Sequence, residues 1–292
     1  MILSAHSPAK LNLFLHITGR RPDGYHNLQT LFQFVDFCDR LEFERTPDHS
    51  AIQVEPALAG VPAEQNLIWR AARLLQDTTG CTQGARIKLH KQLPMGGGLG
   101  GGSSNAATTL VALNHLWQTG LNRDALCTLG LKLGADVPIF VHGHAALAHG
   151  VGERFDDVEV PEPWYLIAIP ACHAPTAELF QEKQLTRDSD PITICAFLDG
   201  AGHNDFEPVL RKRFPLIDRC LHLMDTVSKA KVTGSGACLF CSFTDEQSAR
   251  SANQQLLERM PAFSLTHQDV SWRIAKGLNR SPLYSGCLAN LV

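Results

Sequence analysis

The sequence predicts an α+β protein with two parts, each of which combines strands with helices. Runs of strand periodicity and helix periodicity alternate along the 292 residues. A stretch at 156–163 is acidic, contains proline and has few residues suited to a core, so it separates one alternating region from the next. Hydrophobic residues make up 44% of the chain and charged residues 19%, which supplies enough apolar material for a buried core. We therefore predict mixed or antiparallel sheets in two domains, 1–157 and 158–292.

The first part begins with a regularly alternating strand. Leucine and isoleucine fill one face of residues 8–17, so Lys10 and Asn12 share the opposite face. Pro22-Asp23-Gly24 predicts a turn, after which a second strand follows. The same patterns predict the remaining elements of this part: a strand at 28–35, a helix at 66–76, a strand at 85–93, a helix after a glycine-rich loop, and a helix at 125–133 that ends at Gly134.

The second part repeats this mixture of strands and helices. Residues 164–169 predict a buried strand, and 186–191 a loop. Helical residues cover 205–223, with a break near Pro215. Two strands joined by a glycine turn are predicted within 231–244, and an amphipathic helix at 247–260.

The most informative stretch is rich in glycine and lies between a predicted strand and a predicted helix. Six of the seven residues at 96–102 are glycine. Glycine adopts φ > 0 readily and leaves its backbone N–H group accessible. Ser103 or Ser104 is a suitable N-cap for the helix that follows. Because unpaired N–H groups and the helix dipole both attract anions, we predict a phosphate-binding loop here.

Other types of glycine loop fit this stretch less well. The P-loop pattern requires a lysine before Ser103, and the sequence has none there. Gly96, Gly98 and Gly101 satisfy the dinucleotide pattern G-x-G-x-x-G, but no acidic residue closes a second strand about 20 residues later. A flexible linker is the remaining alternative, although linkers rarely join a well-formed strand to a well-formed helix.

Composition limits the class of partner. A net charge of −3 argues against nucleic acid and acidic membranes as general partners. We see neither a signal peptide nor a membrane-spanning run, and the nine cysteines are scattered, so we predict a reduced, cytoplasmic protein. His142, His144 and His149 cluster without other residues at metal-ligand spacing, and we predict no protein metal site. A monomer and a homodimer both remain open.

Three motifs stand in order along the chain, and together they identify a family. They are Pro8-Ala-Lys-Leu-Asn12, the glycine-rich segment 94–107, and Thr233-Gly-Ser-Gly-Ala237. This arrangement resembles the GHMP kinase superfamily. Further matching phrases extend the similarity over about residues 8–240; they lie at 21–26, 133–138, 150–153 and 204–208.

The resemblance implies a fold and an activity. The fold would pair an N-terminal domain like domain 2 of ribosomal protein S5 with a ferredoxin-like α/β C-terminal domain. The activity would be that of an ATP-dependent small-molecule kinase. Within the superfamily, the phrases are most similar to kinases of non-mevalonate isoprenoid synthesis, whose acceptor is the 2-hydroxyl of a methylerythritol that carries cytidine diphosphate.

The resemblance also implies a catalytic pair, Lys10 and Asp136. Taken alone, Lys10 fits a solvated strand face and Asp136 fits a turn or cap carboxylate. In the family, the matching aspartate lies near the acceptor hydroxyl and the matching lysine lies beside it. An ammonium group there would favour the ionised carboxylate and stabilise developing negative charge. Whether the aspartate removes the proton or aligns the hydroxyl stays open.

The residues expected around the cytidine-bearing acceptor come from both parts of the chain. An aromatic ring can stack on a cytosine face, while imidazole and amide groups bond to its edge. Pro175 stands where the family commonly has serine. Taken alone, Phe180 fits a core position, and Gly234 with Gly236 fits a hairpin. The acceptor-binding set that the resemblance implies is Asn12, Tyr25, His26, Thr176, Phe180, Gly234 and Ser235.

A second set is expected around ATP. Asn66 fits the adenine site and the N-cap of a helix equally well. Mg²⁺ is expected to accompany the ATP phosphates, with the hydroxyl of Ser103 or Ser104 as its candidate protein ligand. The ATP-binding set that the resemblance implies is Asn66, Lys91, Pro94, Met95, Gly96, Gly97, Gly98, Leu99, Gly100, Gly101, Gly102, Ser103 and Ser104.

Three alternative functions remain at this stage. Another kinase of the superfamily, acting on mevalonate, homoserine or a sugar, would not need a cytidine-binding site around Tyr25. A dinucleotide-dependent oxidoreductase would use the G-x-G-x-x-G match and would bind NAD(H) in place of ATP. A non-catalytic nucleotide-binding module would not need Lys10 and Asp136.

Overall fold

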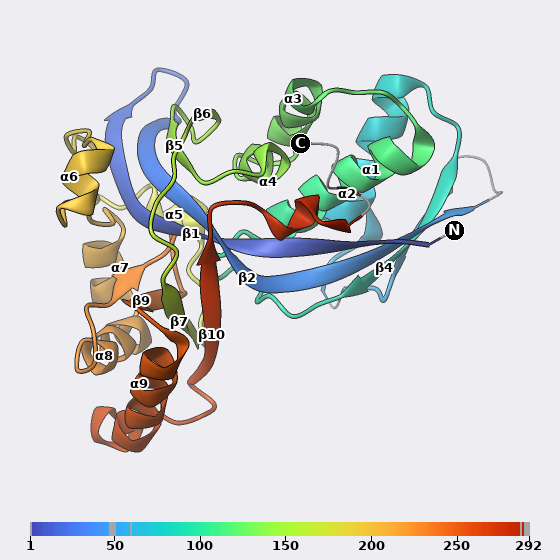
Figure 1. The fold of residues 1–292 in the computed structure, drawn as a ribbon. Coiled ribbons are helices and arrows are strands. Elements are labelled where there is room, and N and C mark those ends of the chain that lie inside the picture. The colour runs from blue at the N-terminus through green and yellow to red at the C-terminus, as the bar shows by residue number, and fades with distance from the viewer. Residues whose placement is uncertain (1, 47–50, 59, 287, 289–292) are drawn as a thin grey trace.

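Two long antiparallel strands, β1 (Ile2–Arg20) and β2 (His26–Thr46), run through the centre of the molecule (Figure 1). The computed structural model describes residues 2–46, 51–58, 60–286 and 288. The two strands pair from Ile2↔Glu44 to Arg20↔His26, with register shifts at three points. The turn predicted at residues 22–24 joins them.

The first sheet is completed by four shorter strands: β3 (Ile52–Glu55), β4 (Gly84–His90), β5 (Ala146–His149) and β6 (Arg154–Asp157). Their order is β3-β4-β2, while β5 pairs with β2 and β6. Four helices cover this sheet (Figure 1): α1 (Leu67–Thr79), α2 (Gly101–Trp117), α3 (Arg123–Leu133) and α4 (Val137–His142). Leucine, isoleucine, alanine and phenylalanine side chains fill the space between them.

The glycine-rich loop follows β4 and leads into α2. The strand that comes next in the chain, β5, pairs antiparallel with β2 and β6 and does not join β4. A dinucleotide-binding unit requires its glycine loop and helix to lead to an adjacent parallel strand. The fold therefore contradicts the oxidoreductase alternative.

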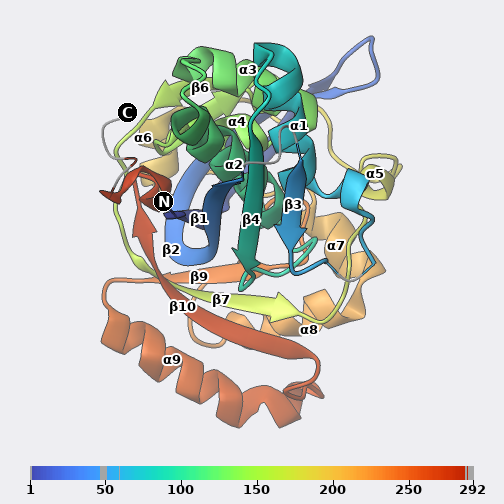
Figure 2. The same ribbon diagram turned by 90° about the vertical axis from the view of Figure 1, so that its right-hand side faces the viewer.

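The second part is an antiparallel sheet in the order β10-β7-β9-β8. These strands are β7 (Trp164–Pro170), β8 (Lys231–Val232), β9 (Leu239–Phe243) and β10 (Val270–Leu278). Its helices are α5 (Thr176–Leu179), α6 (Ile194–Leu198), α7 (Glu207–Arg213), α8 (Pro215–Met224) and α9 (Glu246–Arg259). The helix α9 runs along β10 (Figure 2). Across both parts of the chain, short 3₁₀ turns occur at Ala63–Gln65, Met260–Phe263 and Pro282–Tyr284.

The two parts are joined by more than one chain crossing. The end of β10 pairs with β2 through Gly277↔Val35 and Leu278↔Phe34, which connects the sheets. After β10 the chain returns to the first part, where Leu283 and Leu288 are buried in its core. Among the described residues, no helix is long and apolar enough to span a membrane.

The predicted elements are confirmed, with two instructive differences. The helix α2 begins at Gly101, and its N-cap is Gly100 with φ +74°, so the prediction of Ser103 or Ser104 as N-cap was wrong. A Cβ at Gly100 would lie 2.7 Å from the Phe140 ring and 3.2 Å from Cε of Lys10, so this close, left-handed turn requires glycine. The structure also excludes the alternative interpretation of Lys10 as part of a solvated strand face, because both faces of β1 are covered there and Lys10 is 2% exposed.

Candidate active site

A cavity of about 980 Å³ lies between the two parts of the molecule. Its walls come from β1, the β1–β2 turn, the glycine-rich loop, the start of α2, the start of α4, the β7–α5 connection and the glycine turn before β9. Seventeen predicted site residues line it: Lys10, Asn12, Tyr25, His26, Pro94, Gly96, Gly97, Gly98, Gly100, Gly101, Gly102, Ser103, Asp136, Thr176, Phe180, Gly234 and Ser235.

Lys10 and Asp136 form an ion pair in the cavity wall. Their side-chain atoms Nζ and Oδ2 are 3.3 Å apart. Lys10 is 2% exposed, whereas the Asp136 side chain is 40% exposed, so the carboxylate is the partner that a ligand can reach. Asp136 occupies the N-cap position of α4 but accepts no cap hydrogen bond, which leaves its oxygens free for another role. The structure therefore does not support the cap interpretation of Asp136.

Asn12 fixes the position of the Lys10 ammonium group. The amide oxygen Oδ1 of Asn12 accepts a 2.5 Å hydrogen bond from Nζ. Its Nδ2 donates to Oγ1 of Thr30, which lies on β2, and its backbone N–H donates to Oγ1 of Thr233 in the second part. The Lys10 ammonium also lies 5.3 Å from the centre of the Phe32 ring. Because Asn12 is itself held by Thr30 and Thr233, the amide that contacts the buried lysine has a defined position.

The glycine-rich loop is shaped by three glycines in the left-handed region. Gly96, Gly98 and Gly100 have φ values of +71°, +79° and +74°, which side chains rarely adopt. The loop is tied to β1, because the backbone N–H of Lys10 donates to the carbonyl of Leu99. The N–H groups in the first turn of α2 have no partners within the helix. Together with the helix dipole, they form a site suited to phosphate oxygens.

The two glycine motifs predicted from sequence are in direct contact. A Cβ at Gly98 would overlap the carbonyl oxygen of Thr233, and a Cβ at Gly97 would lie 2.6 Å from Sγ of Cys238. The backbone N–H of Cys238 also donates to the carbonyl of Gly97. Cys238 is buried, and burial raises the pKa of its thiol to about 12, which fits a packing role. Glycine is therefore required where the loops cross.

The opposite wall of the cavity is aromatic. The His26 and Phe180 rings stack at 4.8 Å with an interplanar angle of 18°. Tyr25 lines the same cavity from the β1–β2 turn and is 66% exposed. The hydroxyls of Thr176 and Ser235 lie 2.6 Å apart and close the wall between α5 and the glycine turn. The structure thus brings together side chains from both parts of the chain, as the resemblance implied.

Five predicted site residues lie outside the cavity lining: Asn66, Lys91, Met95, Leu99 and Ser104. Asn66 is the N-cap of α1 and accepts from the N–H of Ile68. Ser104 is fully buried and accepts a hydrogen bond from Ser7. Met95 is exposed, whereas Leu99 is buried.

Lys91 takes part in a clamp on the glycine-rich loop. Its Nζ lies 2.6 Å from Oδ2 of Asp39, which is completely buried. The same carboxylate accepts from the N–H groups of Gln92 and Leu93, before the loop, and from Nδ2 of Asn105, after it. Asp39 therefore fixes both ends of the loop. No local pattern indicates these contacts, because Asp39 is separated from its partners by more than 50 positions along the chain.

Several cavity residues were not predicted from sequence. Arg20, Thr30, His173 and Arg187 line the cavity along with Asp23, which pairs with Arg21 outside it. Asp23 belongs to the turn predicted at residues 22–24, whereas the other four residues lie in no motif of the sequence, so only the fold brings them to the site. Arg20 and Arg187 add positive charge to the wall that holds His26, which suits an anionic ligand.

The described residues contain no group of three or more histidine, cysteine or acidic side chains that could hold a metal ion. Two of the clustered histidines contact carboxylates, His142 that of Asp157 and His149 that of Asp156. Ser103 is the predicted hydroxyl that lines the cavity, while Ser104 is buried.

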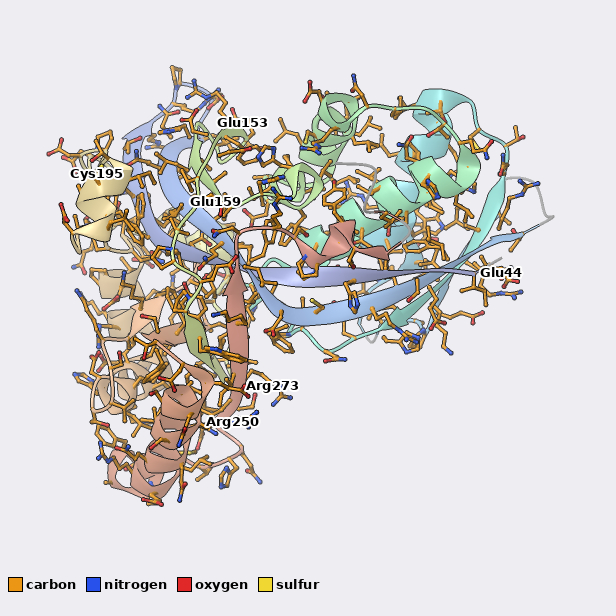
Figure 3. All side chains as sticks on the ribbon, viewed as in Figure 1. Glu44, Glu153, Glu159, Cys195, Arg250 and Arg273 are labelled. Carbon is orange, nitrogen blue, oxygen red and sulfur yellow. The ribbon has the colours of Figure 1, made fainter. Side chains whose placement is uncertain are left out.

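Many charged side chains, including Arg250 on α9 and Arg273 on β10, project from the periphery (Figure 3).

Comparisons with known families match both parts of the chain. The GHMP kinases N terminal domain matches residues 66–144, and the GHMP kinases C terminal domain matches residues 177–262. Among curated proteins, the chain is 53% identical over 279 residues to the 4-diphosphocytidyl-2-C-methyl-D-erythritol kinase of Methylococcus capsulatus, covering 95% of this chain and 92% of that protein. It is 52% identical to the protein of the same name from Nitrosococcus oceani, covering 95% of each.

Solved structures show the same architecture. A crystal structure of 4-(cytidine 5'-diphospho)-2C-methyl-D-erythritol kinase superposes with a TM-score of 0.78 at 31% identity, covering 94% of this chain and 99% of that one. A homoserine kinase from Cytophaga hutchinsonii superposes with a TM-score of 0.70 at 17% identity, covering 96% of each chain. At that identity the second match speaks for the fold alone.

Proposed function

The chain belongs to the GHMP kinase family, and we propose that it uses ATP to phosphorylate the 2-hydroxyl of 4-diphosphocytidyl-2-C-methyl-D-erythritol. One observation carries this proposal: a single cavity holds a phosphate cradle, a lysine–aspartate pair and an aromatic wall. The relatives that share about half of their residues with this chain carry the name of that kinase.

In this proposal the glycine-rich loop and the start of α2 bind the phosphates of ATP. The left-handed glycines let the loop backbone approach the phosphate oxygens closely, and the N–H groups at the start of α2 donate to them. Asp39 holds both ends of the loop in place. Phosphoryl transfer depends mainly on positioning and charge stabilisation, so a rigid cradle contributes directly to the rate.

Asp136 and Lys10 act on the acceptor hydroxyl. The exposed carboxylate of Asp136 accepts a hydrogen bond from the 2-hydroxyl. This bond orients the hydroxyl oxygen toward the terminal phosphate of ATP. Lys10, whose Nζ lies 3.3 Å from Oδ2 of Asp136, offsets the negative charge that develops on the transferred group. As the hydroxyl oxygen bonds to phosphorus and the bond to ADP breaks, the hydroxyl proton passes to Asp136.

The cytidine end of the acceptor occupies the aromatic wall. The base lies against the exposed ring of Tyr25 and beside the stacked His26 and Phe180 rings. His26 bonds to the edge of the base, while Arg20 provides positive charge for the diphosphate. This wall is the feature that a kinase for mevalonate or homoserine would not need.

Mg²⁺ enters with ATP. The described part of the chain offers no cage of acidic side chains, and Mg²⁺ in kinases is held largely by phosphate oxygens and water. When bound, it neutralises phosphate charge. The Ser103 hydroxyl, at the start of α2, is the protein group we assign to it.

Every described cysteine is free, which suits a reducing compartment, and we propose that the enzyme works in the cytoplasm.

A comparison of acceptors tests the proposal. ADP release with Mg·ATP is measured with 4-diphosphocytidyl-2-C-methyl-D-erythritol, mevalonate and homoserine in parallel. We expect turnover with the cytidyl acceptor and none above background with the other two. Turnover of mevalonate or homoserine, with the cytidyl acceptor inert, would refute the substrate assignment while leaving the ATP site intact.

A further inference from the structure

Arg187 is the side chain that connects the two sides of the aromatic wall. Its Nε donates to Nε2 of His26, which opens β2, at 3.3 Å. Its two terminal nitrogens donate to three backbone carbonyls of the second part, those of Phe180, Glu182 and Leu185, at 2.7–2.9 Å. A single guanidinium group therefore holds a base-facing histidine and the chain segment that carries its stacking partner.

This arrangement fixes which His26 nitrogen carries the proton. A guanidinium group has only donors, so Nε2 of His26 must accept and the proton must lie on Nδ1. Among the described residues, Nδ1 of His26 has no hydrogen-bond partner, and His26 lines the cavity. Burial lowers the pKa of His26, and the positive charges of Arg187 and Arg20 lower it further, so the neutral ring is favoured.

The position of Phe180 is set by the same group. Arg187 bonds to the carbonyl of Phe180 itself, and the Phe180 ring packs between His26, at 4.8 Å, and the edge of Phe206, at 5.0 Å. Loss of the guanidinium would free both the ring nitrogen of His26 and the backbone of the 180–187 segment. The His26 and Phe180 rings would then no longer be held in fixed positions relative to each other.

We propose that Arg187 is a positioning residue that makes His26 a donor at Nδ1 and so selects cytosine over uracil. Cytosine has an unprotonated ring nitrogen, N3, next to the carbonyl O2, and both accept hydrogen bonds. Uracil carries a proton on N3, which would oppose the Nδ1–H donor of His26. Two buried donors that face each other raise the free energy of the complex, because neither has an acceptor. The proton on Nδ1 of His26 therefore weakens the binding of uracil relative to cytosine. This inference rests on the proposed function and adds the residue that sets its base preference.

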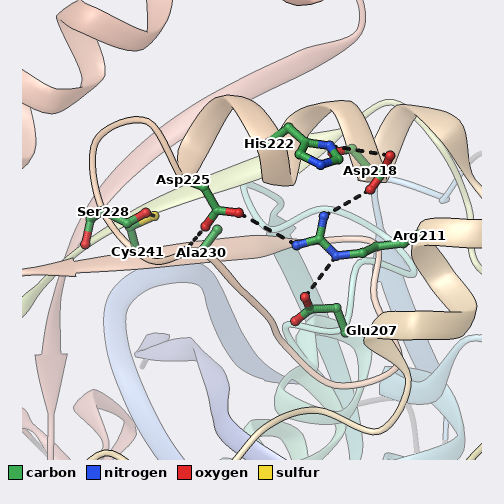
Figure 4. Close-up of polar contacts among 8 residues, drawn as sticks. All are labelled: Glu207, Arg211, Asp218, His222, Asp225, Ser228, Ala230 and Cys241. Carbon is green, nitrogen blue, oxygen red and sulfur yellow. Dashed lines mark hydrogen bonds and ion pairs between the residues drawn. The ribbon is translucent and has the colours of Figure 1, made fainter.

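Arg211 offers a matched control elsewhere in the fold. It lies on α7 and bonds to Glu207 and Asp218 at 3.0 Å, with Asp225 at 3.7 Å (Figure 4). It is an arginine with several partners that does not line the cavity. Arg211→Gln therefore reproduces the loss of an arginine network without touching the wall.

The test combines binding with a spectroscopic measurement. Dissociation constants for cytidine 5'-diphosphate and uridine 5'-diphosphate are measured for the wild-type protein, Arg187→Gln, Arg187→Lys and Arg211→Gln. Imidazole ¹⁵N shifts report the His26 tautomer, assigned by comparison with His26→Gln. We expect the wild-type His26 to carry its proton on Nδ1. In Arg187→Gln we expect the cytidine preference to fall about tenfold and the KM of the cytidyl acceptor to rise, while the KM of ATP stays unchanged.

Three results would overturn the proposal. One is a wild-type His26 protonated on Nε2, which needs no variant to observe. Another is an unchanged cytidine-to-uridine ratio in both Arg187 variants, and a third is an equal loss of that ratio in Arg211→Gln. Failure of the proposed function is distinguishable, because the wild-type protein would then bind cytidine diphosphate without turning over the cytidyl acceptor.

Discussion

At the scale of single residues, the central feature is a difference in exposure between two paired charges. Lys10 is buried and held by Asn12, whereas its partner Asp136 opens onto the cavity. The buried ammonium group is thus paired with a carboxylate that an acceptor hydroxyl can reach. The sequence alone left this pair ambiguous, because nothing local distinguishes a catalytic aspartate from a turn aspartate.

Asp136→Asn tests the role of this carboxylate. The amide cannot take a proton but nearly conserves shape, so we expect kcat to fall by about 1,000-fold with little change in the KM of ATP. The measurement is steady-state ADP release. Asp225→Asn is the matched control, since the Asp225 side chain is 42% exposed and lies outside the cavity lining. A variant at Asp136 that kept wild-type turnover would place the chemistry on another group.

At the scale of elements, the conformation of the glycine-rich loop is set by its contacts with other parts of the chain. Gly98 has φ +79° and lies close to the backbone of Thr233. The two glycine motifs are therefore packed against each other and do not act as independent flexible turns. The loop is also anchored at both ends by Asp39. Its rigidity therefore comes from long-range contacts between elements, not from its own composition.

Gly98→Ala tests the close approach. The added methyl group must displace the loop from Thr233, and a displacement of about 1 Å at a reacting phosphate costs about 100-fold in kcat/KM for ATP. Gly120→Ala is the matched control, because Gly120 has φ +74° but open space around it. Both variants carry the strain of a positive φ. Equal activities in the two variants would mean that the crossing of the loops does not matter.

Sequence patterns predicted the long strands of the first part and most of the longer helices, because strand and helix periodicity is local. They did not predict β3, β5, β6 or β10, the strand that connects the two sheets. They also predicted the glycine loop and, through the resemblance, the residues that line the cavity. They failed where a contact spans the chain: Asp39 with Lys91, and Arg187 with His26, are separated by 52 and 161 positions. They also misjudged the N-cap of α2, where the close approach to Phe140 and Lys10 requires glycine in place of a capping serine.

At the scale of the whole molecule, the segment 189–205 is bound along β1 by a histidine network. Nδ1 of His16 donates to the carbonyl of Asp190, and Nε2 accepts from the N–H of His203. Asp205 completes the contact by accepting from the N–H of Ile17 and from Ser189. Both nitrogens of the buried His16 are thus committed to the neutral ring.

The folded protein should therefore lose stability in acid through His16. Burial lowers its pKa below the value of about 6.5 expected in the unfolded chain, so the unfolded chain binds the proton first as the pH falls. Stability is fully present above pH 6.5 and declines as the pH falls through the lower folded pKa. We expect urea unfolding at several pH values to show a free energy of unfolding that decreases as the pH falls below about 6.5. A His16→Gln variant that showed the same pH dependence would contradict this assignment.

The measurement that tests the account most directly is the position of the new phosphate in the product. The purified protein is incubated with Mg·ATP and 4-diphosphocytidyl-2-C-methyl-D-erythritol, and the reaction is followed by ³¹P NMR, with Asp136→Asn alongside. We predict one new phosphomonoester resonance that grows with ADP in the wild-type protein and is nearly absent in the variant. Because C2 carries no hydrogen, this resonance should lack the ³¹P–¹H coupling that a phosphate on the 1- or 3-hydroxyl would show. ATP turnover without a phosphorylated cytidyl product, or a phosphate on another hydroxyl, would contradict the account.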